Sequence, residues 1–200
     1  MKNPKVKIAR ALGIPFTSKA SRIMEHRPAA PGQHGLNRKR SPSVFKTQLM
    51  EKQRLKATYS ISEKQLKRYF NEARRSSENT GDVLLRLLES RVDSAIFRMG
   101  FANTIYAARQ YVSHGHFNVN DRRTNTPSQM LKPGSVVSIR EKSKNHPQIL
   151  DALTHSQSVQ VPEYYEINKV KMEGRLVALP QREQIPVNIK EQLVVEYYSR

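Results

Sequence analysis

Positive charge is the feature that most restricts how this chain can fold. Lysine and arginine number 35 against 17 aspartate and glutamate residues, which gives a formal net charge of +18. Repulsion among so many cations opposes a compact state unless bound anions offset it. The excess therefore indicates that the folded protein has a polyanionic partner.

The charge is unevenly distributed along the 200 residues. Residues 1–80 carry a net charge of +14, residues 81–145 carry +5 and residues 146–200 carry −1. A polyanion should therefore bind mainly to the first two-thirds of the chain. The nearly neutral last quarter is better suited to packing within the protein or to binding another protein.

Composition also excludes several kinds of protein. The chain has no cysteine, so disulfides, thiolate metal sites and cysteine nucleophiles are ruled out, which fits a reducing compartment. No apolar run approaches the roughly 20 residues of a membrane span, and no apolar signal core follows Met1. We therefore expect a cytoplasmic protein without a membrane partner.

Residues 1–42 are predicted to form an extended basic arm. They are rich in proline and glycine, and residues 27–35 are incompatible with a helix. The arm ends near three adjacent cations, Arg38, Lys39 and Arg40. Two interpretations remain open: a disordered arm that only increases solubility, or an extension that threads between phosphates and orders on binding.

A helical domain is predicted over residues 43–90, completed by residues 180–200. Helical spacing begins after Ser43, and Ser60 with Glu63 fits a capping box. One apolar stripe follows at helical spacing, formed by Leu66, Tyr69, Phe70 and Ala73. The opposite face is basic and holds Lys64, Lys67, Arg68, Arg74 and Arg75.

Glu89 and Asp93 lie one helical turn apart and could be mistaken for paired catalytic carboxylates. Proton transfer would need a cleft and a second set of functional groups, and the sequence indicates neither. We therefore predict that both residues form surface ion pairs with Arg86 or other neighbours.

Residues 91–153 are predicted to form a small module of two helices followed by two strands. The first helix should end at Gly100, a left-handed cap, and Asn103 or Thr104 should cap the second helix. The strands are expected at residues 117–120 and 135–139, where apolar and polar side chains alternate.

A tight turn at residues 121–122 is expected between those strands, and residues 154–179 are predicted to be connecting strands and turns. A helix is expected to start near residues 188–191, although the following side chains also fit a strand. The fold class is therefore α+β: a helical N-terminal domain with a basic arm, plus a small α/β module.

The residues of this module closely resemble the small RNA-binding fold that is named after ribosomal protein S-four (S4). Its motifs are Arg-Val-Asp at 91–93, Arg-Met-Gly-Phe at 98–101, Ala-Ala-Arg-Gln-Tyr-Val-Ser-His-Gly-His at 107–116, Val-Asn at 119–120, Lys-Pro-Gly at 132–134 and Ile-Arg-Glu-Lys at 139–142. The fold also occurs in pseudouridine synthases, a tRNA synthetase and a heat-shock protein, so alone it implies only binding to structured RNA.

Three further segments narrow the resemblance to the bacterial-type S4 family of small-subunit ribosomal proteins. They are Arg-Pro with Pro-Gly-Gln-His-Gly within 27–35, Glu-Lys-Gln-Arg at 51–54 and Gln-Leu-Val-Val-Glu-Tyr-Tyr-Ser-Arg at 192–200. The resemblance covers nearly the whole chain. It is to the zinc-free form, because the N-terminal cysteine cluster of some members is missing here.

The resemblance implies a structural, non-enzymatic component of the ribosome without a metal or other cofactor. It implies a primary binder of 16S rRNA that helps nucleate assembly of the body of the small subunit. Its expected partners also include ribosomal protein S-five (S5), with which it would contribute to translational accuracy, other small-subunit proteins, and messenger RNA near the entry channel.

Two positions depart from the family pattern. Ile105 and Tyr106 stand where many relatives have a Thr-Arg pair, which puts one phosphate contact in doubt. Asp121 replaces a glycine often found in the hairpin, and aspartate tolerates the left-handed region better than most residues.

Cations fixed on rigid elements suit A-form RNA, which proteins often recognise by its shape and phosphates. One predicted phosphate-facing surface consists of Arg91, Arg98, Arg109, Arg122, Arg123, Lys132, Arg140, Lys142 and Lys144. A second consists of Lys52, Arg54, Lys56, Lys67 and Arg68. His114 is expected to donate a hydrogen bond to RNA or to cap backbone groups, and some of the arginines are expected to pair with Glu89, Asp93 or Glu141 instead.

Alternative functions are less well supported by the sequence. An RNA-modifying enzyme could use the same module, but the rest of the chain has no phosphate-binding loop and no nucleophile elbow. His114 and His116 could share a metal, yet no neighbouring side chain completes a ligand set. A nonspecific nucleic-acid protein is the third alternative, and competition with unrelated RNA would distinguish it.

Overall fold

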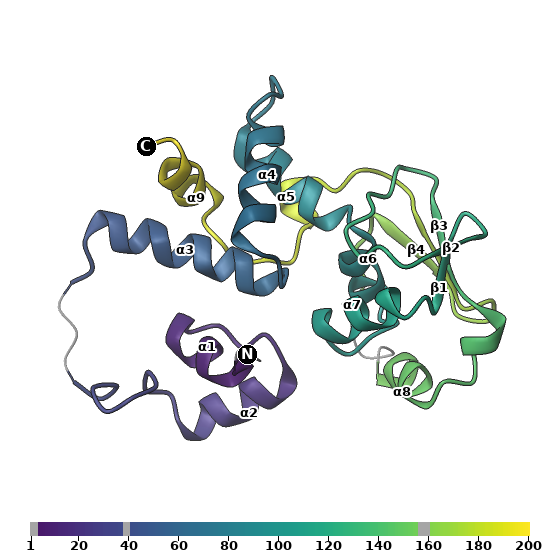
Figure 1. Cartoon of the computed structure of the whole chain (residues 1–200), viewed down its shortest axis with the longest axis horizontal. Coiled ribbons are helices and arrows are strands. Elements are labelled where there is room, and N and C mark those ends of the chain that lie inside the picture. Colours follow the sequence, from purple (N-terminus) through teal and green to yellow (C-terminus); the bar gives the residue numbers. More distant parts are fainter. Residues whose placement is uncertain (1–3, 38–40, 156–160) are drawn as a thin grey trace. The chain divides into compact units, whose positions relative to one another are not determined.

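The structure is a computed structural model that describes residues 4–37, 41–155 and 161–200 (Figure 1). The chain divides into two compact units, residues 1–70 with 188–200 and residues 71–187. We call them the first and the second unit. The predicted α+β fold class is confirmed, since the first unit is helical and the second contains an antiparallel sheet.

The first unit contains two helices in the segment predicted to be extended. The helices of this unit are α1 (Lys5–Leu12), α2 (Ser18–His26), α3 (Val44–Thr58), most of α4 (Glu63–Ala73) and α9 (Glu191–Tyr198). Thr17 caps α2 by accepting a hydrogen bond from the Ala20 amide, and Gly13 ends α1 in the left-handed region at φ 71°. Residues 27–35 are not helical, as predicted.

The predicted capping box at Ser60 and Glu63 is wrong by two residues. Ser60 has a φ of 51° and ends α3 in the left-handed region. The cap of α4 is Ser62, whose hydroxyl accepts from the Gln65 amide while the Gln65 side chain accepts from the Ser62 amide. The chain needs one left-handed residue between the helices, and this moves the start of α4.

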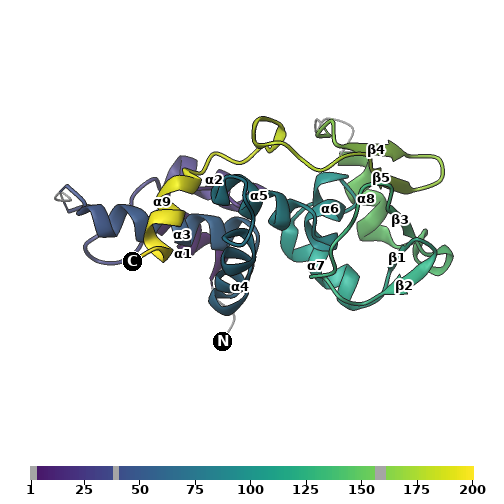
Figure 2. The same ribbon diagram turned by 90° about the horizontal axis from the view of Figure 1, so that it is seen from above.

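The apolar stripe predicted on α4 is confirmed. Its four side chains are buried: Leu66, Tyr69, Phe70 and Ala73. The predicted helix start near residues 188–191 is also confirmed, and the strand alternative is wrong. α9 lies beside α3 in both views (Figures 1 and 2), and the rings of Phe70 and Tyr198 stack with centroids 4.9 Å apart.

The second unit is built around one sheet. Its helices are α5 (Thr80–Glu89), α6 (Val92–Arg98), α7 (Ile105–Ser113) and α8 (Pro147–His155), with single 3-10 turns η1 (Glu141–Ser143) and η3 (Arg182–Gln184). The strands are β1 (Phe117–Val119), β2 (Arg122–Thr124), β3 (Val136–Ile139), β4 (Tyr165–Asn168) and β5 (Glu173–Leu176). They pair antiparallel in the order β2-β1-β3-β5-β4.

The strands β1 and β3 were predicted, but β2 was not. The turn lies at Asn120 and Asp121, with φ of 48° and 63°, and not at residues 121–122. Two left-handed residues make the tight turn that suits the twist of a hairpin, so Arg122 begins β2. Strands β4 and β5 come from residues 154–179, which were predicted to be connecting strands and turns, but the pairing of β5 with β3 was not predicted.

Helices α6 and α7 cover one face of this sheet (Figures 1 and 2). The core between them is apolar and includes Ile96, Val112, Phe117 and Val137, all fully buried. At Gly174, β5 lies so close to the Met99 side chain that a Cβ there would be 2.5 Å from the Met99 sulfur. The predicted ends of the helices are confirmed, because Gly100 is left-handed at φ 77° and Thr104 caps α7.

Candidate nucleic-acid interface

Arg91 lies inside the second unit and not on its surface. Its guanidinium donates twice to Asp93, with Nε–Oδ1 at 2.9 Å and Nη2–Oδ2 at 2.6 Å, and both side chains are 0% exposed. The Asp93 carboxylate also accepts from the Ser94 amide. This pair fixes the start of α6, and in this conformation Arg91 cannot present its charge to an external phosphate.

Arg98 is similarly engaged. Its Nη2 lies 2.7 Å from Oε1 of Glu89, which is fully buried. The Tyr164 hydroxyl donates to the same carboxylate, and the Tyr165 hydroxyl donates to the main-chain carbonyl of Glu89. Burial and the charge of Glu89 raise the pKa of both tyrosines, so these hydroxyls remain donors.

The prediction of surface ion pairs for Glu89 and Asp93 is therefore wrong about their position. Both carboxylates are paired, but in the core and with Arg98 and Arg91. Arg86 pairs with Glu78 instead. Spacing along a helix indicates which charged side chains can form an ion pair, whereas tertiary packing decides whether that ion pair is buried.

The remaining cations of the second unit are accessible to different extents. Arg122, Arg123, Lys132 and Lys142 are exposed, while Arg109, Arg140 and Lys144 are half-buried. Lys144 pairs with Glu141 at 2.6 Å, whereas the pairs expected of arginines form at Asp93 and Glu89. Lys132 lies in the turn before β3, and Arg140 directly follows β3.

Several predicted site residues meet at Gly115, just after α7. Nη1 of Arg140 donates to the Gly115 carbonyl at 3.1 Å. The guanidinium of Arg123 covers the glycine so closely that a Cβ there would lie 2.5 Å from its Nε. His114 is adjacent and exposed. We call Arg123, Arg140, His114 and Gly115 the Gly115 cluster.

Two further histidines lie next to the Gly115 cluster. His116 packs beside His114, and His146 packs beside His116. His146 was not among the predicted site residues, because 29 residues separate it from His116 and hide this proximity from any local pattern. Within residues 4–37, 41–155 and 161–200, no group of three or more histidine and carboxylate side chains is arranged to hold a metal ion.

Most predicted cations of α3 are used inside the first unit. The Lys52 side chain is only 5% exposed, with its Nζ 2.8 Å from Oε1 of Glu63 and 4.6 Å from the centre of the Tyr197 ring. Arg54 donates to the Leu12 carbonyl and to Glu51.

Lys56 lies farther from the same carboxylate, at 3.4 Å from Oε2 of Glu63. On α4, Lys67 and Arg68 are exposed, so they are the members of the second predicted surface best placed to meet a ligand. The predicted contacts at Arg38, Lys39 and Arg40 lie outside the described residues.

Glu63 is the acceptor at the centre of this network. Burial raises its pKa, but hydrogen bonds from Lys52 and Tyr198 and the charge of Lys52 outweigh that effect and lower the pKa below its usual value. The Tyr198 hydroxyl donates to Oε1 of Glu63 at 2.7 Å. The carboxylate therefore joins α3, the start of α4 and α9.

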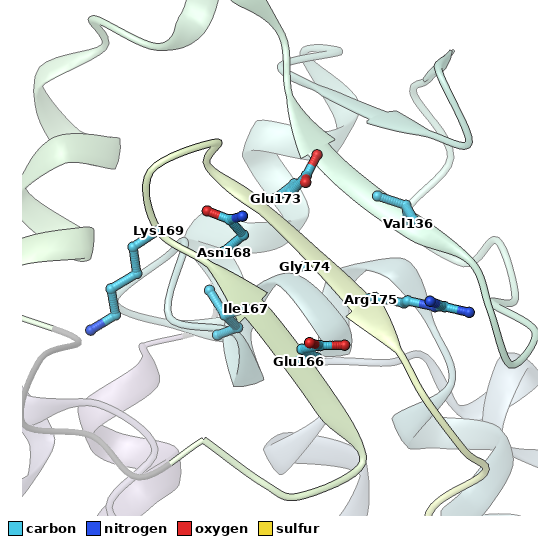
Figure 3. A pocket seen from close by; sticks show the side chains of 8 residues that line it. All are labelled: Val136, Glu166, Ile167, Asn168, Lys169, Glu173, Gly174 and Arg175. Carbon is cyan, nitrogen blue, oxygen red and sulfur yellow. The ribbon is translucent and has the colours of Figure 1, made fainter.

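A shallow hollow of about 450 Å³ lies on the outer face of the sheet, around strands β3, β4 and β5 (Figure 3). Its lining includes two carboxylates, Glu166 and Glu173, and two cations, Lys169 and Arg175. Because these charges balance, the hollow offers a phosphate group no net attraction. We therefore do not include this hollow in the nucleic-acid interface.

Comparison with known proteins gives two family matches that meet at residues 89 and 90, directly after α5. Residues 1–89 match the family described as "Ribosomal protein S4/S9 N-terminal domain", and residues 90–137 match the "S4 domain". The protein is similar to proteins named "Small ribosomal subunit protein uS4" from Granulibacter bethesdensis and Chlorobium phaeovibrioides. The identities are 47% over 199 residues and 43% over 194 residues, covering 98% and 97% of this chain and 97% and 96% of the relatives. The chain belongs to the uS4 family.

Membership of the uS4 family confirms the resemblance drawn from the motifs. The uS4 relatives carry the name of a structural protein of the small ribosomal subunit, so the chain is a ribosomal protein with an RNA-binding domain and not an RNA-modifying enzyme. Among the described residues, no helix is both long and apolar enough to cross a membrane.

Proposed function

We propose that this protein is a primary binder of 16S rRNA in the cytoplasmic small ribosomal subunit. The observation that carries the proposal is the Gly115 cluster, where a strand, a strand end and a helix end fix three basic groups around one glycine. The proposed RNA-binding residues are Arg38, Lys39, Arg40, Lys56, Lys67, Arg68, Arg109, His114, Arg122, Arg123, Lys132, Arg140, Lys142 and Lys144.

The other predicted site residues receive a supporting role. Arg91, Arg98, Lys52 and Arg54 are held by carboxylates or backbone carbonyls within their own unit. Such contacts fix the elements on which the accessible cations stand. Rigid placement matters because RNA that is recognised by shape requires charges at defined separations.

Arginine and lysine contribute differently to this interface. Arginine can bridge two phosphate oxygens, whereas lysine acts as a point charge. If about 6–10 phosphates are contacted, affinity should fall about 10³–10⁵-fold between about 50 and 200 mM salt by the rule for duplex DNA. A strong salt dependence is therefore expected of the whole protein.

We further propose that the protein helps nucleate the body of the small subunit, lies near the messenger RNA entry channel and, with ribosomal protein S5, contributes to translational accuracy. Membership of the uS4 family and the near-neutral charge of residues 146–200 support a protein partner beside the RNA. Omitting this protein from reconstitution should then delay incorporation of S5 and other body proteins, which mass spectrometry of the particles would measure.

The domain division that we propose follows these roles. It consists of an arm over residues 1–42, a helical domain over 43–90 completed by 180–200, an RNA-binding module over 91–153 and connecting strands over 154–179. The two family matches meet at residues 89 and 90, which supports the boundary between the helical domain and the module.

Chemical footprinting of 16S rRNA with and without the protein tests the proposal. We expect protection of a defined region in the 5′ part of the rRNA, and retention of that RNA against excess unrelated RNA at moderate salt. Equal affinity for a scrambled RNA of the same length would overturn the proposal and favour a nonspecific nucleic-acid protein.

A further inference from the structure

Three histidines gather at the C-terminal end of α7. His114 and His116 follow α7 directly, whereas His146 precedes α8. The ring centroids of His114 and His116 are 6.0 Å apart, and those of His116 and His146 are 5.2 Å apart. The Tyr111 ring lies 6.1 Å from His116 and 5.8 Å from His146, so the four rings form one contiguous group.

The polar atoms of these rings are only partly satisfied. Nδ1 of His116 shares a hydrogen bond with the Ser143 hydroxyl at 2.9 Å. Nδ1 of His146 is buried and has no hydrogen-bond partner among the described residues. Leaving a buried ring nitrogen without a hydrogen-bond partner costs free energy. We therefore expect this nitrogen to gain a partner when the protein binds a ligand.

The charges that face these rings are mainly positive. Arg140 at the end of β3 and Arg123 on β2 meet at Gly115, between His114 and His116. Lys142 on η1 is exposed, and Lys144 at the end of η1 is paired with Glu141.

One further acid lies near the group, Asp151 on α8. Its charge acts on Tyr111, whose hydroxyl donates to Gln148. It does not offset the cations at Gly115: burial lowers the pKa of His116, and His146, His114 and Arg140 lower it further. His116 is therefore expected to be neutral at physiological pH when no anion is bound.

We propose that a phosphodiester group of the bound RNA occupies the Gly115 cluster and that its binding takes up protons at His114, His116 and His146. A phosphate beside the guanidiniums of Arg123 and Arg140 places a negative charge next to the three imidazoles, where the neighbouring charges of the free protein are mainly positive. An anion that binds the protonated state more tightly must, by linkage, increase proton binding when it binds. This inference rests on the proposed binding of rRNA.

The consequence is an affinity that depends on pH. If about one proton is taken up per phosphate bound, RNA affinity rises up to about tenfold for each pH unit by which the pH falls between about 8 and 6. Arginine and lysine keep their charge throughout this range. A pH dependence here would therefore come from histidine.

Isothermal titration calorimetry on the full chain with a 16S rRNA fragment tests the inference. Titrations at constant salt in two buffers of different ionisation enthalpy give the number of protons taken up. We expect uptake of about one proton by the wild type near pH 7. The double variant H116Q/H146Q should lose most of this uptake.

Two further variants serve as controls. H26Q changes an exposed histidine of the first unit and should leave proton uptake unchanged. H114Q changes an exposed member of the group and should reduce uptake even if substitution of His116 or His146 disturbs folding, which circular dichroism would reveal.

The possible results separate the two proposals. RNA binding without proton uptake, or uptake that persists in both H114Q and H116Q/H146Q, overturns this inference alone. No specific RNA binding at any pH overturns the proposed function as well. Equal uptake when inorganic phosphate replaces RNA would overturn the assignment to a phosphodiester, since the site would then be one for free phosphate.

Discussion

Helix α3 and the Gly115 cluster use the same kinds of side chain for opposite purposes. On α3, Lys52 and Arg54 are held by Glu63, Glu51 and a backbone carbonyl. In the Gly115 cluster, Arg140 donates to the Gly115 carbonyl, and the guanidinium of Arg123 lies over the same glycine. Side chains of one kind therefore stabilise the fold where they are buried against carboxylates, as Lys52 is, and are available to a ligand where they are exposed, as Arg123 is.

The buried pair of Arg91 and Asp93 extends this rule and gives the largest expected effect. The variant R91A leaves an uncompensated carboxylate in the core, which should lower the free energy of unfolding by about 3–5 kcal/mol. Urea denaturation followed by circular dichroism would measure it. The exposed control R122A should stay within about 0.5 kcal/mol of wild type.

If R91A kept the stability of the wild type but bound RNA more weakly, the assignment of Arg91 to the fold would be wrong. Arg91 would then contact RNA, and the buried pair would not hold in solution.

Lys52 and Lys67 provide the next test, because they lie on neighbouring helices and differ in exposure. K52M should lower the free energy of unfolding by about 1–2 kcal/mol, since Glu63 loses the nearer of its two lysine partners. K67M should leave stability unchanged and reduce the slope of log affinity against log salt by about 1. If K67M lowered stability and K52M lowered only the salt slope, Lys67 would stabilise the fold and Lys52 would contact RNA.

Gly115 tests the cluster itself. In G115A the new Cβ would lie 2.5 Å from Nε of Arg123 and the residue would keep a φ of 72°. We expect a loss of about 1–2 kcal/mol in stability from the left-handed backbone. RNA affinity should fall as well, because Arg123 must move. Binding assays at a temperature where both proteins are folded would measure that change, and unaltered affinity would show that the position of Arg123 is unimportant.

The arm carries three adjacent cations in a segment rich in proline and glycine. Replacing Arg38, Lys39 and Arg40 with alanine should weaken RNA binding and reduce the salt slope by about 2–3. An unchanged slope would favour the interpretation that the arm only increases solubility.

Glu63 gives the smallest expected effect. Because its pKa is lowered in the folded state, its contribution to stability is present above the unfolded value of 4.5 and is lost as the pH falls through the folded value. The wild type should therefore lose stability below about pH 4.5 more steeply than E63Q. Denaturation curves between pH 7 and pH 3 would show this, and parallel curves would contradict it.

Much of the local structure could be predicted from the sequence. The stripe on α4, the left-handed end at Gly100 and the cap at Thr104 depend on residues a few positions apart, and all three predictions are confirmed. The resemblance to the S4 family rested on motifs over the whole chain and is confirmed as well.

Two incorrect predictions were local shifts of one or two residues, the cap of α4 and the turn before β2. The incorrect predictions about burial depended on contacts between distant residues. The burial of Glu89 requires Tyr164 and Tyr165, which lie more than 70 residues away. The same holds for the histidine group, since nothing near His146 in the sequence indicates His116. Which cations are available to RNA was therefore not predictable from charge alone.

The order of the strands has a consequence for synthesis of the protein. β5 pairs with β3, and α9 packs against α3, so each unit is completed by residues from the last fifth of the chain. Neither unit can complete its fold until the ribosome has synthesised these C-terminal residues. A nascent chain that stalls before residue 165 lacks the strand that covers the edge of β3, and one that stalls before residue 188 lacks the helix that encloses Lys52. Maturation of this protein must therefore be largely post-translational.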